Sequence, residues 1–383
     1  MNKGFTGLPI NIFRERIEKI KQELLKRDLD ALFSFSDEYR PGYTVYLSDY
    51  YPINIIEESP QGVYISRHGD VVLFLGSINA QTAKGISWIK DIRSIEKMSL
   101  FFNKLKEKEG RRLKIGLVGE ALLPVKYYYK LRSCLENHDF INADDIINKM
   151  RQIKDLNEIK LMEKAAQLGD QAIREASKRL REGNVKEVEL AAVAEYTIRS
   201  NGGNIGSATI LSSGINTMKP TWRPSNKRIM PGEAVLIDVN PSLNCYCSDV
   251  SVTLFNGRVS KEKQKLLDLS KEILHGVIKY IKPEMPASAI YDYFLEKVQK
   301  VGYEKYFTPY ANGFRAVGHG VGLDVVEWPN LDSKSNFILK PGMTLAVKFD
   351  LHGFNFGGIR YEADVLVEEN QCRSLNNIIY EDL

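Results

Sequence analysis

The sequence predicts a mixed α/β (α+β) protein that folds into two unequal domains, residues 1–150 and 151–383. Three observations favour this fold class. The chain has 383 residues, which exceeds the usual size of a single hydrophobic core. Helical and strand patterns alternate along its first part. Its second part contains two similar strand pairs that carry charged residues, which indicates two related halves that face each other across one site.

The N-terminal domain is predicted from an alternation of amphipathic helices and apolar strands. The turn Arg67-His-Gly-Asp between two apolar runs is typical of a hairpin. No phosphate-binding loop or GxGxxG fingerprint occurs in this part, so we expect a structural or substrate-covering role. The predicted elements are a helix at residues 12–25, strands at 31–35, 62–66 and 71–75, helices at 80–90 and up to Lys108, and a strand at 113–119.

The C-terminal domain has predicted helices around its two strand pairs. Apolar residues at helical spacing predict a long amphipathic helix over residues 156–181. Asn184 and Glu187 have the spacing of a capping box at the start of the next helix, residues 188–200. Further helices are predicted at residues 261–280 and 287–301.

The first strand pair places two carboxylates close together. Residues 235–237 form an apolar strand that ends in Asp238, and a return strand at residues 246–254 carries Asp249. The turn between the strands brings both carboxylates to one end of the predicted hairpin. Paired carboxylates suit either coordination of a hard metal ion or acid and base chemistry.

The second strand pair repeats this pattern with one change. Lys348 follows a Pro-Gly pair at the same spacing that separates Asp238 from its own Pro-Gly pair. The return segment then carries Glu362 where the first pair carries Asp249. Three acids and one lysine therefore converge on the predicted site.

A histidine flanked by glycines lies between these pairs, in the segment Gly318-His-Gly-Val-Gly. Glycines on both sides indicate that the backbone needs conformational freedom and that the imidazole must be reached. We therefore expect His319 to be a ligand or a catalytic residue.

Composition excludes several classes of partner. The net charge of +4 is spread along the chain, and the basic clusters mix both signs, so we expect no nucleic-acid partner. No run of about twenty apolar residues occurs and the first residues lack the apolar core of a secretion signal, so we expect no membrane contact. A cytoplasmic protein with reduced thiols is expected, because no CxxC spacing occurs among Cys134, Cys245, Cys247 and Cys372.

Together these features resemble the M24 or pita-bread superfamily of aminopeptidases P, prolidases, methionine aminopeptidases and creatinases. The likeness covers nearly the whole chain and rests on the order and spacing of its motifs. The resemblance implies a creatinase-type N-terminal domain, a pita-bread domain with a pseudo-twofold repeat, a small-molecule substrate and a homodimer. The motifs are Arg151-Gln-Ile-Lys-Asp-Leu-Asn-Glu-Ile, Ser213-Gly-Ile-Asn, Leu236-Ile-Asp, Tyr246-Cys-Ser-Asp, Gly318-His-Gly-Val-Gly-Leu, Lys340-Pro-Gly-Met and Gly358-Ile-Arg-Tyr-Glu.

Metallopeptidases of this family hold two divalent ions with two Asp, one His and two Glu. The resemblance places the fifth of these ligands on Lys348, and the other four on Asp238, Asp249, His319 and Glu362. An ammonium about 4 Å from a carboxylate gains roughly 4 kcal/mol at an effective dielectric constant of 20, so Lys348 should stay protonated and occupy part of the space of one ion.

We therefore expect either no cofactor or one divalent ion, with manganese, zinc and iron as the candidates. Three acids and one ammonium leave a charge of about minus two, which one divalent ion or a cationic ligand neutralises. The alternative is that the side chain of Lys348 points outward to solvent and leaves the acids to a conventional metal site.

Histidines that the family uses in catalysis also do not carry over. Thr221 stands where one is expected, Val326 replaces the histidine of a His-Glu pair, and Arg315 falls at a further histidine position. The resemblance implies that these three positions bind substrate. Another side chain must supply their proton transfer if the chemistry is kept.

Three hypotheses of function follow. The first is a hydrolase of C–N bonds that acts on a small amino-acid-like compound, cationic in one version, at a mononuclear or metal-free site. In it Glu362, Asp249 or Glu327 activates water, while His319 shuttles a proton and Lys348 stabilises an oxyanion. The second is a binding protein that kept the fold and lost the chemistry. The third is an ordinary Xaa-Pro peptidase.

Overall fold

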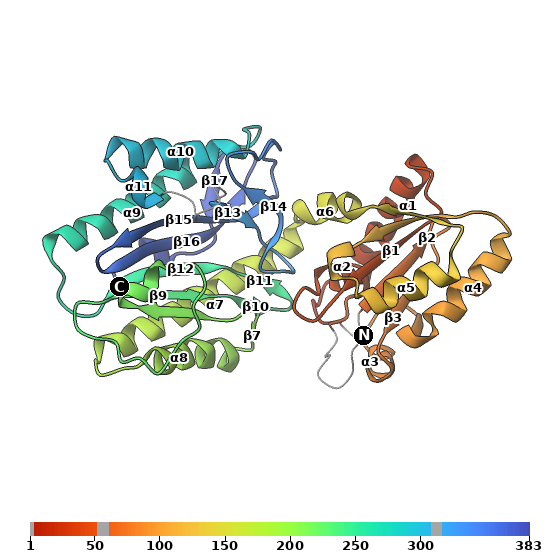
Figure 1. Cartoon of the computed structure of the whole chain (residues 1–383), viewed down its shortest axis with the longest axis horizontal. Coiled ribbons are helices and arrows are strands. Elements are labelled where there is room, and N and C mark those ends of the chain that lie inside the picture. Colours follow the sequence, from red (N-terminus) through yellow and green to blue (C-terminus); the bar gives the residue numbers. More distant parts are fainter. Residues whose placement is uncertain (1–3, 52–60, 308–315) are drawn as a thin grey trace. The chain divides into compact units, whose positions relative to one another are not determined.

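A computed structural model of the protein describes residues 4–51, 61–307 and 316–383. The chain divides into two compact units, Met1–Arg151 and Gln152–Leu383 (Figure 1). The predicted mixed α/β class is confirmed, since both units contain helices packed on sheets. No helix within the described residues has the length and apolar character that crossing a bilayer requires.

The first unit is built on a six-stranded sheet with the order β4-β3-β2-β1-β5-β6. Its central strand β1 pairs antiparallel with β2 and parallel with β5. The predicted hairpin is confirmed, because β2 and β3 are antiparallel neighbours. The elements are α1 (Ile10–Lys26), β1 (Ala31–Ser36), α2 (Gly42–Ser48), β2 (Gln61–Ser66), β3 (Val71–Leu75), α3 (Ser77–Ala83), β4 (Asp91–Ser94), η1 (Ile95–Lys97), α4 (Met98–Glu109), β5 (Lys114–Val118), η2 (Glu120–Leu122), α5 (Val125–Cys134), β6 (Asp139–Asn142) and α6 (Asp144–Gln152).

Aromatic side chains fill the core of this unit. The ring of Phe33 on β1 lies 5.7 Å from that of Phe74 on β3 and 5.2 Å from that of Phe102 on α4, measured between ring centroids. Tyr64 on β2 packs edge-on against the same helix. These contacts join three strands and α4 into one buried cluster.

The second unit contains a sheet of eight strands with the order β14-β13-β15-β16-β12-β9-β8, in which β17 also pairs with β16. A separate three-stranded sheet has the order β11-β10-β7. The elements are α7 (Leu156–Arg181), α8 (Glu187–Ser200), β7 (Asn204–Ile205), β8 (Ile210–Ser213), η3 (Gly214–Met218), β9 (Ala234–Val239), β10 (Pro241–Leu243), β11 (Tyr246–Cys247), β12 (Val250–Phe255), α9 (Lys261–Tyr280), α10 (Ser288–Lys300), α11 (Glu304–Phe307), β13 (Gly318–Gly320), β14 (Glu327–Leu331), β15 (Thr344–Phe354), β16 (Gly357–Val367), β17 (Cys372–Ser374) and η4 (Ile378–Tyr380).

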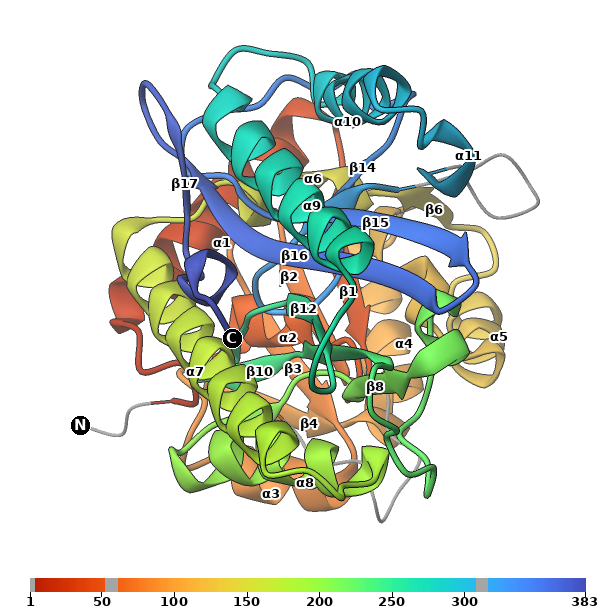
Figure 2. The same ribbon diagram turned by 90° about the vertical axis from the view of Figure 1, so that its left-hand side faces the viewer.

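The two long strands β15 and β16 separate the core of this unit from its polar face. Their odd-numbered residues from 345 to 351 and from 359 to 367 are apolar and buried in the core. Helix α9 contributes to the same core and crosses β15 and β16 (Figure 2). The even-numbered residues 348, 350, 360, 362 and 364 are charged. Because side chains alternate across a strand, all of these charges lie on the opposite face of the sheet.

The start of α8 differs from the sequence-based expectation. The helix begins at Glu187, and the carboxylate that accepts the N–H of Lys186 belongs to Glu189. Asn184 has a positive φ of 48° and takes no part in the cap. The predicted capping box is therefore wrong, and the side chain of Glu187 is used elsewhere.

Candidate metal and active site

The register of the sheet collects the predicted site residues on one face. Lys348 on β15 lies directly opposite Glu362 on β16. Ser251 on β12 is paired with both Glu362 and Asp238, so the same face continues across to β9. On the other side, His319 is paired with Ala346 of β15. Directly paired residues point to the same side of a sheet, so these side chains share one surface.

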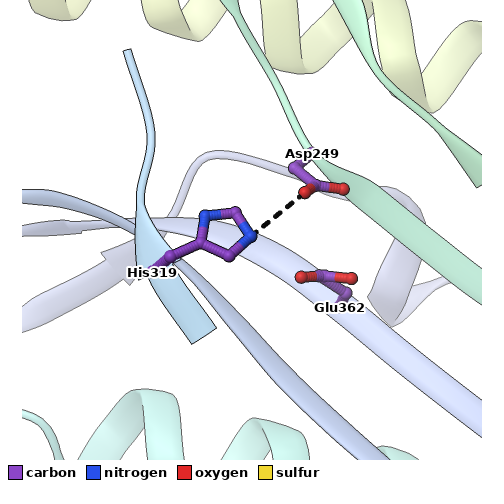
Figure 3. Close-up of side chains that lie close together, drawn as sticks. All are labelled: Asp249, His319 and Glu362. Carbon is purple, nitrogen blue, oxygen red and sulfur yellow. Dashed lines mark ion pairs between the residues drawn. The ribbon is translucent and has the colours of Figure 1, made fainter. Parts of the chain in front are cut away.

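Three of the predicted ligands form a compact cluster. One ligand atom from each of Asp249, His319 and Glu362 lies within 4.8 Å of the other two. Figure 3 shows the imidazole and the two carboxylates pointing toward one another. His319 is on β13, Glu362 is on β16, and Asp249 directly precedes β12. A nitrogen and two carboxylate oxygens at this spacing suit a single divalent transition ion.

His319 is held in place from both ends of its ring. Its Nδ1 lies 3.0 Å from the carbonyl oxygen of Gly320, and its Nε2 lies 3.4 Å from Asp249 Oδ2. Burial alone lowers the pKa of His319, but the hydrogen bond and the negative charge of Asp249 outweigh it, so the pKa is raised.

The glycines around His319 have a steric reason. Gly318 has a φ of 151°, and a Cβ on it would lie 2.1 Å from the carbonyl oxygen of Ala346. A Cβ on Gly320 would lie 2.7 Å from the carbonyl oxygen of Trp328. The strand that carries His319 therefore fits between its two neighbours only without side chains at these positions.

Asp249 is positioned by partners that sequence reasoning missed. Asn240 donates Nδ2 to Asp249 Oδ1 at 2.6 Å, which leaves Oδ2 toward His319. The backbone N–H of Asp249 donates to the carboxylate of Asp364, 3.2 and 3.1 Å from its two oxygens. Burial raises the pKa of Asp364. Asp364 is thus a further buried acid on the polar face, although not part of the three-residue cluster.

Glu362 presents one oxygen to the cluster. Its Oε2 accepts a long hydrogen bond of 3.4 Å from Ser251 Oγ. Its Oε1 is buried and has no hydrogen-bond partner among the described residues, and it lies 4.0 Å from Lys348 Nζ. Burial, and next the charge of Asp249, raise the pKa of Glu362. The ammonium of Lys348 therefore faces the site and does not point away from it.

Asp238 does not join the cluster, although the sequence predicted it as a ligand. Its Oδ2 accepts Nη1 of Arg360 at 2.9 Å, and both side chains are nearly fully buried. Its Oδ1 is buried without a hydrogen-bond partner among the described residues. Burial, and next the charge of Asp249, raise the pKa of Asp238 to about 8, although Arg360 acts to lower it. The guanidinium thus supplies a second fixed cation beside Lys348.

Arg360 belongs to a charged network that the sequence analysis missed. Its Nε lies 3.8 Å from Asp350 Oδ2, and that same oxygen lies 3.1 Å from Nε2 of His352. The signal was present in the sequence, since charged residues alternate with apolar ones through both long strands. Only the pairing of the strands places Asp350 opposite Arg360.

Glu327 lies in a different contact from the one expected for a catalytic acid. Its Oε2 accepts Lys154 Nζ at 3.1 Å, and both side chains are at most 3% exposed. Its Oε1 accepts the backbone N–H of Asp324. The carboxylate of Glu327, which we expected to activate water, is therefore engaged in a buried ion pair. Glu327 is not part of the three-residue cluster.

Two of the three positions predicted to bind substrate, Thr221 and Val326, are exposed. Thr221 is exposed and lies next to Pro220, whose carbonyl oxygen accepts Nη2 of Arg360 at 3.2 Å. Val326 is also exposed. Arg315 lies outside the described residues.

Comparison with known proteins matches both parts of the chain to families. Residues 160–369 match the sequence model of metallopeptidase family M24, and residues 16–153 match that of the creatinase/prolidase N-terminal domain. A Xaa-Pro dipeptidase of Pyrococcus furiosus is 28% identical over 364 residues, which cover 94% of this chain and 97% of the relative.

Solved structures show the same architecture. The prolidase from Pyrococcus horikoshii superposes with a TM-score of 0.83 at 26% identity and covers 95% of this chain and 98% of its own. The X-Pro aminopeptidase from Thermotoga maritima has a TM-score of 0.82 at 24% identity, with coverage of 94% and 97%. Both similarities extend over nearly the full length of this chain.

Proposed function

Because the chain belongs to metallopeptidase family M24, we propose that it hydrolyses a C–N bond of a small amino-acid-like compound with the help of one divalent ion. The observation that carries this proposal is the convergence of Asp249, His319 and Glu362 beside the ammonium of Lys348. The three ligand atoms fit one ion, and the buried oxygen of Glu362 without a hydrogen-bond partner among the described residues is a ready ligand. A carboxylate is missing at the fifth position, so the residues do not fit the family's pair of ions.

The bound ion would lower the pKa of a coordinated water and polarise the carbonyl group of the substrate. Manganese, zinc and iron all accept this mixture of imidazole and carboxylate ligands. In the alternative, a metal-free site, the ammonium of Lys348 at 4.0 Å is the cation that faces the buried carboxylate of Glu362. Burying a carboxylate with so weak a compensation costs free energy. A single ion is therefore the version of the proposal that the buried carboxylates favour.

The chain's own residues supply charge and protons to the reaction. Lys348 carries three N–H donors, and its long contact with Glu362 leaves donors available for an oxygen that gains negative charge. Asp238 has one buried oxygen, Oδ1, without a hydrogen-bond partner among the described residues, while its Oδ2 accepts Nη1 of Arg360. Its raised pKa suits proton transfer near neutral pH, which is the role that Thr221 and Val326 cannot fill.

A cationic substrate is less well supported than a neutral or zwitterionic one. Arg360 is a fixed cation in addition to Lys348, and its Nη1 lies 2.9 Å from Asp238 Oδ2. Even with Asp238, Asp249 and Glu362 all ionised, Lys348 and Arg360 reduce the charge of this group of five residues to about minus one, which one divalent ion more than balances. The acids therefore have no need of a cationic group on the substrate.

Cleavage of Xaa-Pro dipeptides is the second candidate function, and the names of the relatives favour it. Relatives of nearly full-length coverage, from Pyrococcus furiosus and Pyrococcus horikoshii, are Xaa-Pro dipeptidases. The replacements at Thr221, Val326 and Lys348 argue against an unchanged mechanism. Family membership favours either hydrolase over a protein that only binds its ligand.

The test is a hydrolysis screen with the manganese-loaded protein. The panel contains Xaa-Pro dipeptides, other dipeptides, guanidino acids, cyclic amidines and betaines, and the readout is release of the amine product. We expect turnover of at least one small compound. Asp249→Asn should lose at least about tenfold in activity, because mutation even of residues that only support a metal ligand costs about 10–100-fold. A matched control is Asp268→Asn, a substitution on the surface of α9. Binding of panel compounds to the wild type without any cleavage would support the binding protein instead.

The homodimer and the cytoplasmic location stay predictions from the sequence. Light scattering of the purified protein measures its mass in solution and tests the first. Fractionation of cells that express the full chain tests the second.

A further inference from the structure

Residues 213–228 form a segment between β8 and β9 that passes next to the candidate site. Arg360 donates Nη2 to the carbonyl oxygen of Pro220 at 3.2 Å, while its Nη1 lies 2.9 Å from Asp238 Oδ2. Pro220 is therefore separated from a site carboxylate by a single guanidinium. The next residue along the chain is Thr221, which is exposed.

Glu187 at the start of α8 fastens the same segment from its other side. The side chain is fully buried. Its Oε1 accepts the backbone N–H and the hydroxyl of Ser213, at 2.8 and 2.7 Å. Its Oε2 accepts the backbone N–H and the hydroxyl of Ser225, at 3.1 and 2.7 Å, and Nε1 of Trp222 at 3.4 Å. All of these donors come from residues 213–228, so one carboxylate gathers both ends of the segment.

The first turn of α8 strengthens this attachment. The backbone N–H of Glu187 donates to the carbonyl oxygen of Lys227, and that of Val188 donates to the carbonyl oxygen of Ser225, both at 3.1 Å. Helix N-termini leave such donors without partners inside the helix, so the segment acts as their acceptor. Lys227 Nζ in turn donates to Ser213 Oγ at 2.7 Å.

A third attachment joins the segment to the long strands. Thr217 Oγ1 accepts the backbone N–H of Gly358 at 2.8 Å. A Cβ on the neighbouring Gly357 would lie 2.3 Å from the carbonyl oxygen of Gly214, so the segment and β16 are in close backbone contact. Residues 213–228 are thus held by α8, by β16 and by Arg360.

We infer that Glu187 is a positioning residue that fixes the segment 213–228 and so presents Thr221 to the substrate. Thr221 lies between Pro220, which is held by Arg360, and Trp222, which is held by Glu187. Both of these attachments end on buried charged groups, whereas Thr221 itself is exposed beside the site. Its hydroxyl is consequently a preorganised polar contact for a group of the substrate next to the scissile C–N bond. This inference rests on the proposed function.

Glu187→Gln is the sharpest test of the positioning role. A carboxylate offers acceptors on both oxygens, while the amide of Gln offers one oxygen and places two N–H donors on the other side. The backbone N–H groups of Ser213 and Ser225 donate to different oxygens of Glu187. The variant therefore leaves one of these two N–H groups facing another donor, whichever way the amide turns.

Glu189→Gln is the matched control, because Glu189 is on the same helix turn but is exposed. Its carboxylate accepts the backbone N–H of Lys186 and lies 3.9 Å from Nη2 of Arg179. Ser225→Ala is a milder second variant, in case Glu187→Gln does not fold. It removes the 2.7 Å contact of the hydroxyl with Glu187 and the 3.2 Å contact that this hydroxyl accepts from the backbone N–H of Lys227. All proteins are full-length and loaded with manganese. The measurements are hydrogen–deuterium exchange of peptides from residues 213–228, manganese affinity, and kcat and KM on the compound that the wild type cleaves best.

For Glu187→Gln we expect exchange in residues 213–228 to be at least about tenfold faster, and kcat/KM to fall at least about tenfold through a raised KM. Manganese affinity should stay within about twofold, and Glu189→Gln should match the wild type. Unchanged exchange in Glu187→Gln and in Ser225→Ala would overturn the positioning role. Faster exchange with unchanged kcat/KM would overturn the link to the substrate. A wild type that cleaves nothing refutes the proposed function and with it that link, while the exchange data still decide the positioning role.

Discussion

Lys348 lies directly opposite Glu362 in the antiparallel register of β15 and β16, with its Nζ 4.0 Å from Glu362 Oε1. Two residues further along β15, the order of charges is inverted, with Asp350 on β15 opposite Arg360 on β16. The polar face of the sheet therefore carries two fixed cations among its acids. A second metal ion would have to share this surface with the ammonium of Lys348, which repels it.

Lys348→Glu should not by itself produce efficient cleavage of Xaa-Pro dipeptides. The substitution adds a carboxylate, but Thr221 and Val326 still lack the imidazoles that resemblance to the family places there. Proton transfer by a positioned side chain contributes about 10²–10⁴-fold to a rate, so the lack of imidazoles at these two positions should keep the rate on dipeptides low. An assay of the manganese-loaded variant on Ala-Pro measures this. Efficient turnover by Lys348→Glu alone would show that the missing histidines do not matter.

Gly318→Ala should lower the affinity for manganese by at least about tenfold. The new Cβ would lie 2.1 Å from the carbonyl oxygen of Ala346, so β13 must move away from β15 and carry His319 with it. The φ of 151° adds backbone strain. Calorimetric titration gives the affinity. Gly85→Ala is the control, because its nearest atom is 4.0 Å away and it lies in the first unit. An unchanged affinity in Gly318→Ala would contradict the steric account of this segment.

Lys154→Met should destabilise the second unit by about 3–5 kcal/mol, because it leaves the buried carboxylate of Glu327 without its ammonium. The pair lies at 3.1 Å and both side chains are at most 3% exposed. The double variant Lys154→Met with Glu327→Leu should regain most of this loss. Urea denaturation measures the free energy of unfolding. Lys26→Met, at an exposed pair with Glu23, is the control and should change it by less than about 1 kcal/mol. Equal effects of the two lysine substitutions would contradict the role given to the buried pair.

The metal-free protein should lose stability as the pH rises from about 4 to about 8. The folded-state pKa of Asp238 is about 8, raised above its ordinary value of 3.8 by burial and then by the charge of Asp249. The native state therefore binds this proton more tightly than the unfolded chain does. The resulting stabilisation is complete below the ordinary pKa of Asp238 and is lost as the pH rises through the pKa that Asp238 has in the folded protein.

Melting temperatures in a chelating buffer check this dependence. Asp238→Asn removes the titrating group, so its melting temperature should change less between about pH 4 and about pH 8. In a unit of this size, each kcal/mol of stability corresponds to about 2–4 °C in melting temperature. Saturating manganese should also flatten it, since the ion favours the deprotonated cluster. Identical slopes in the wild type and in Asp238→Asn, both free of metal, would argue against a raised pKa for Asp238.

Local patterns predicted the two longest helices well, but the helix expected at residues 80–90 is wrong, because α3 ends at Ala83. Helices α7 and α9 have the bounds expected from their apolar periodicity, because each buries one continuous stripe. The capping box at Asn184 was wrong because the local pattern could not reveal that Glu187 binds a segment 26 to 38 residues away. A favourable long-range contact overrode a weak local preference.

The site was predicted in part for the same reason. The acids stand out by their places in the two similar strand pairs and His319 by its flanking glycines, and three of these residues do meet. The partners Arg360 and Lys154 were missed, because their roles depend on contacts 122 and 173 residues away in the chain. Register between strands and packing between distant elements decide such pairs, and no local spacing encodes them.

The number of manganese ions bound per chain tests the central claim most directly. Elemental analysis after dialysis against low micromolar manganese should give one ion per chain for the wild type and for Lys348→Met, whose neutral side chain adds no ligand. Lys348→Glu adds the carboxylate opposite Glu362 and should bind a second ion. Two tightly held ions in the wild type would contradict the claim that Lys348 limits this site to one.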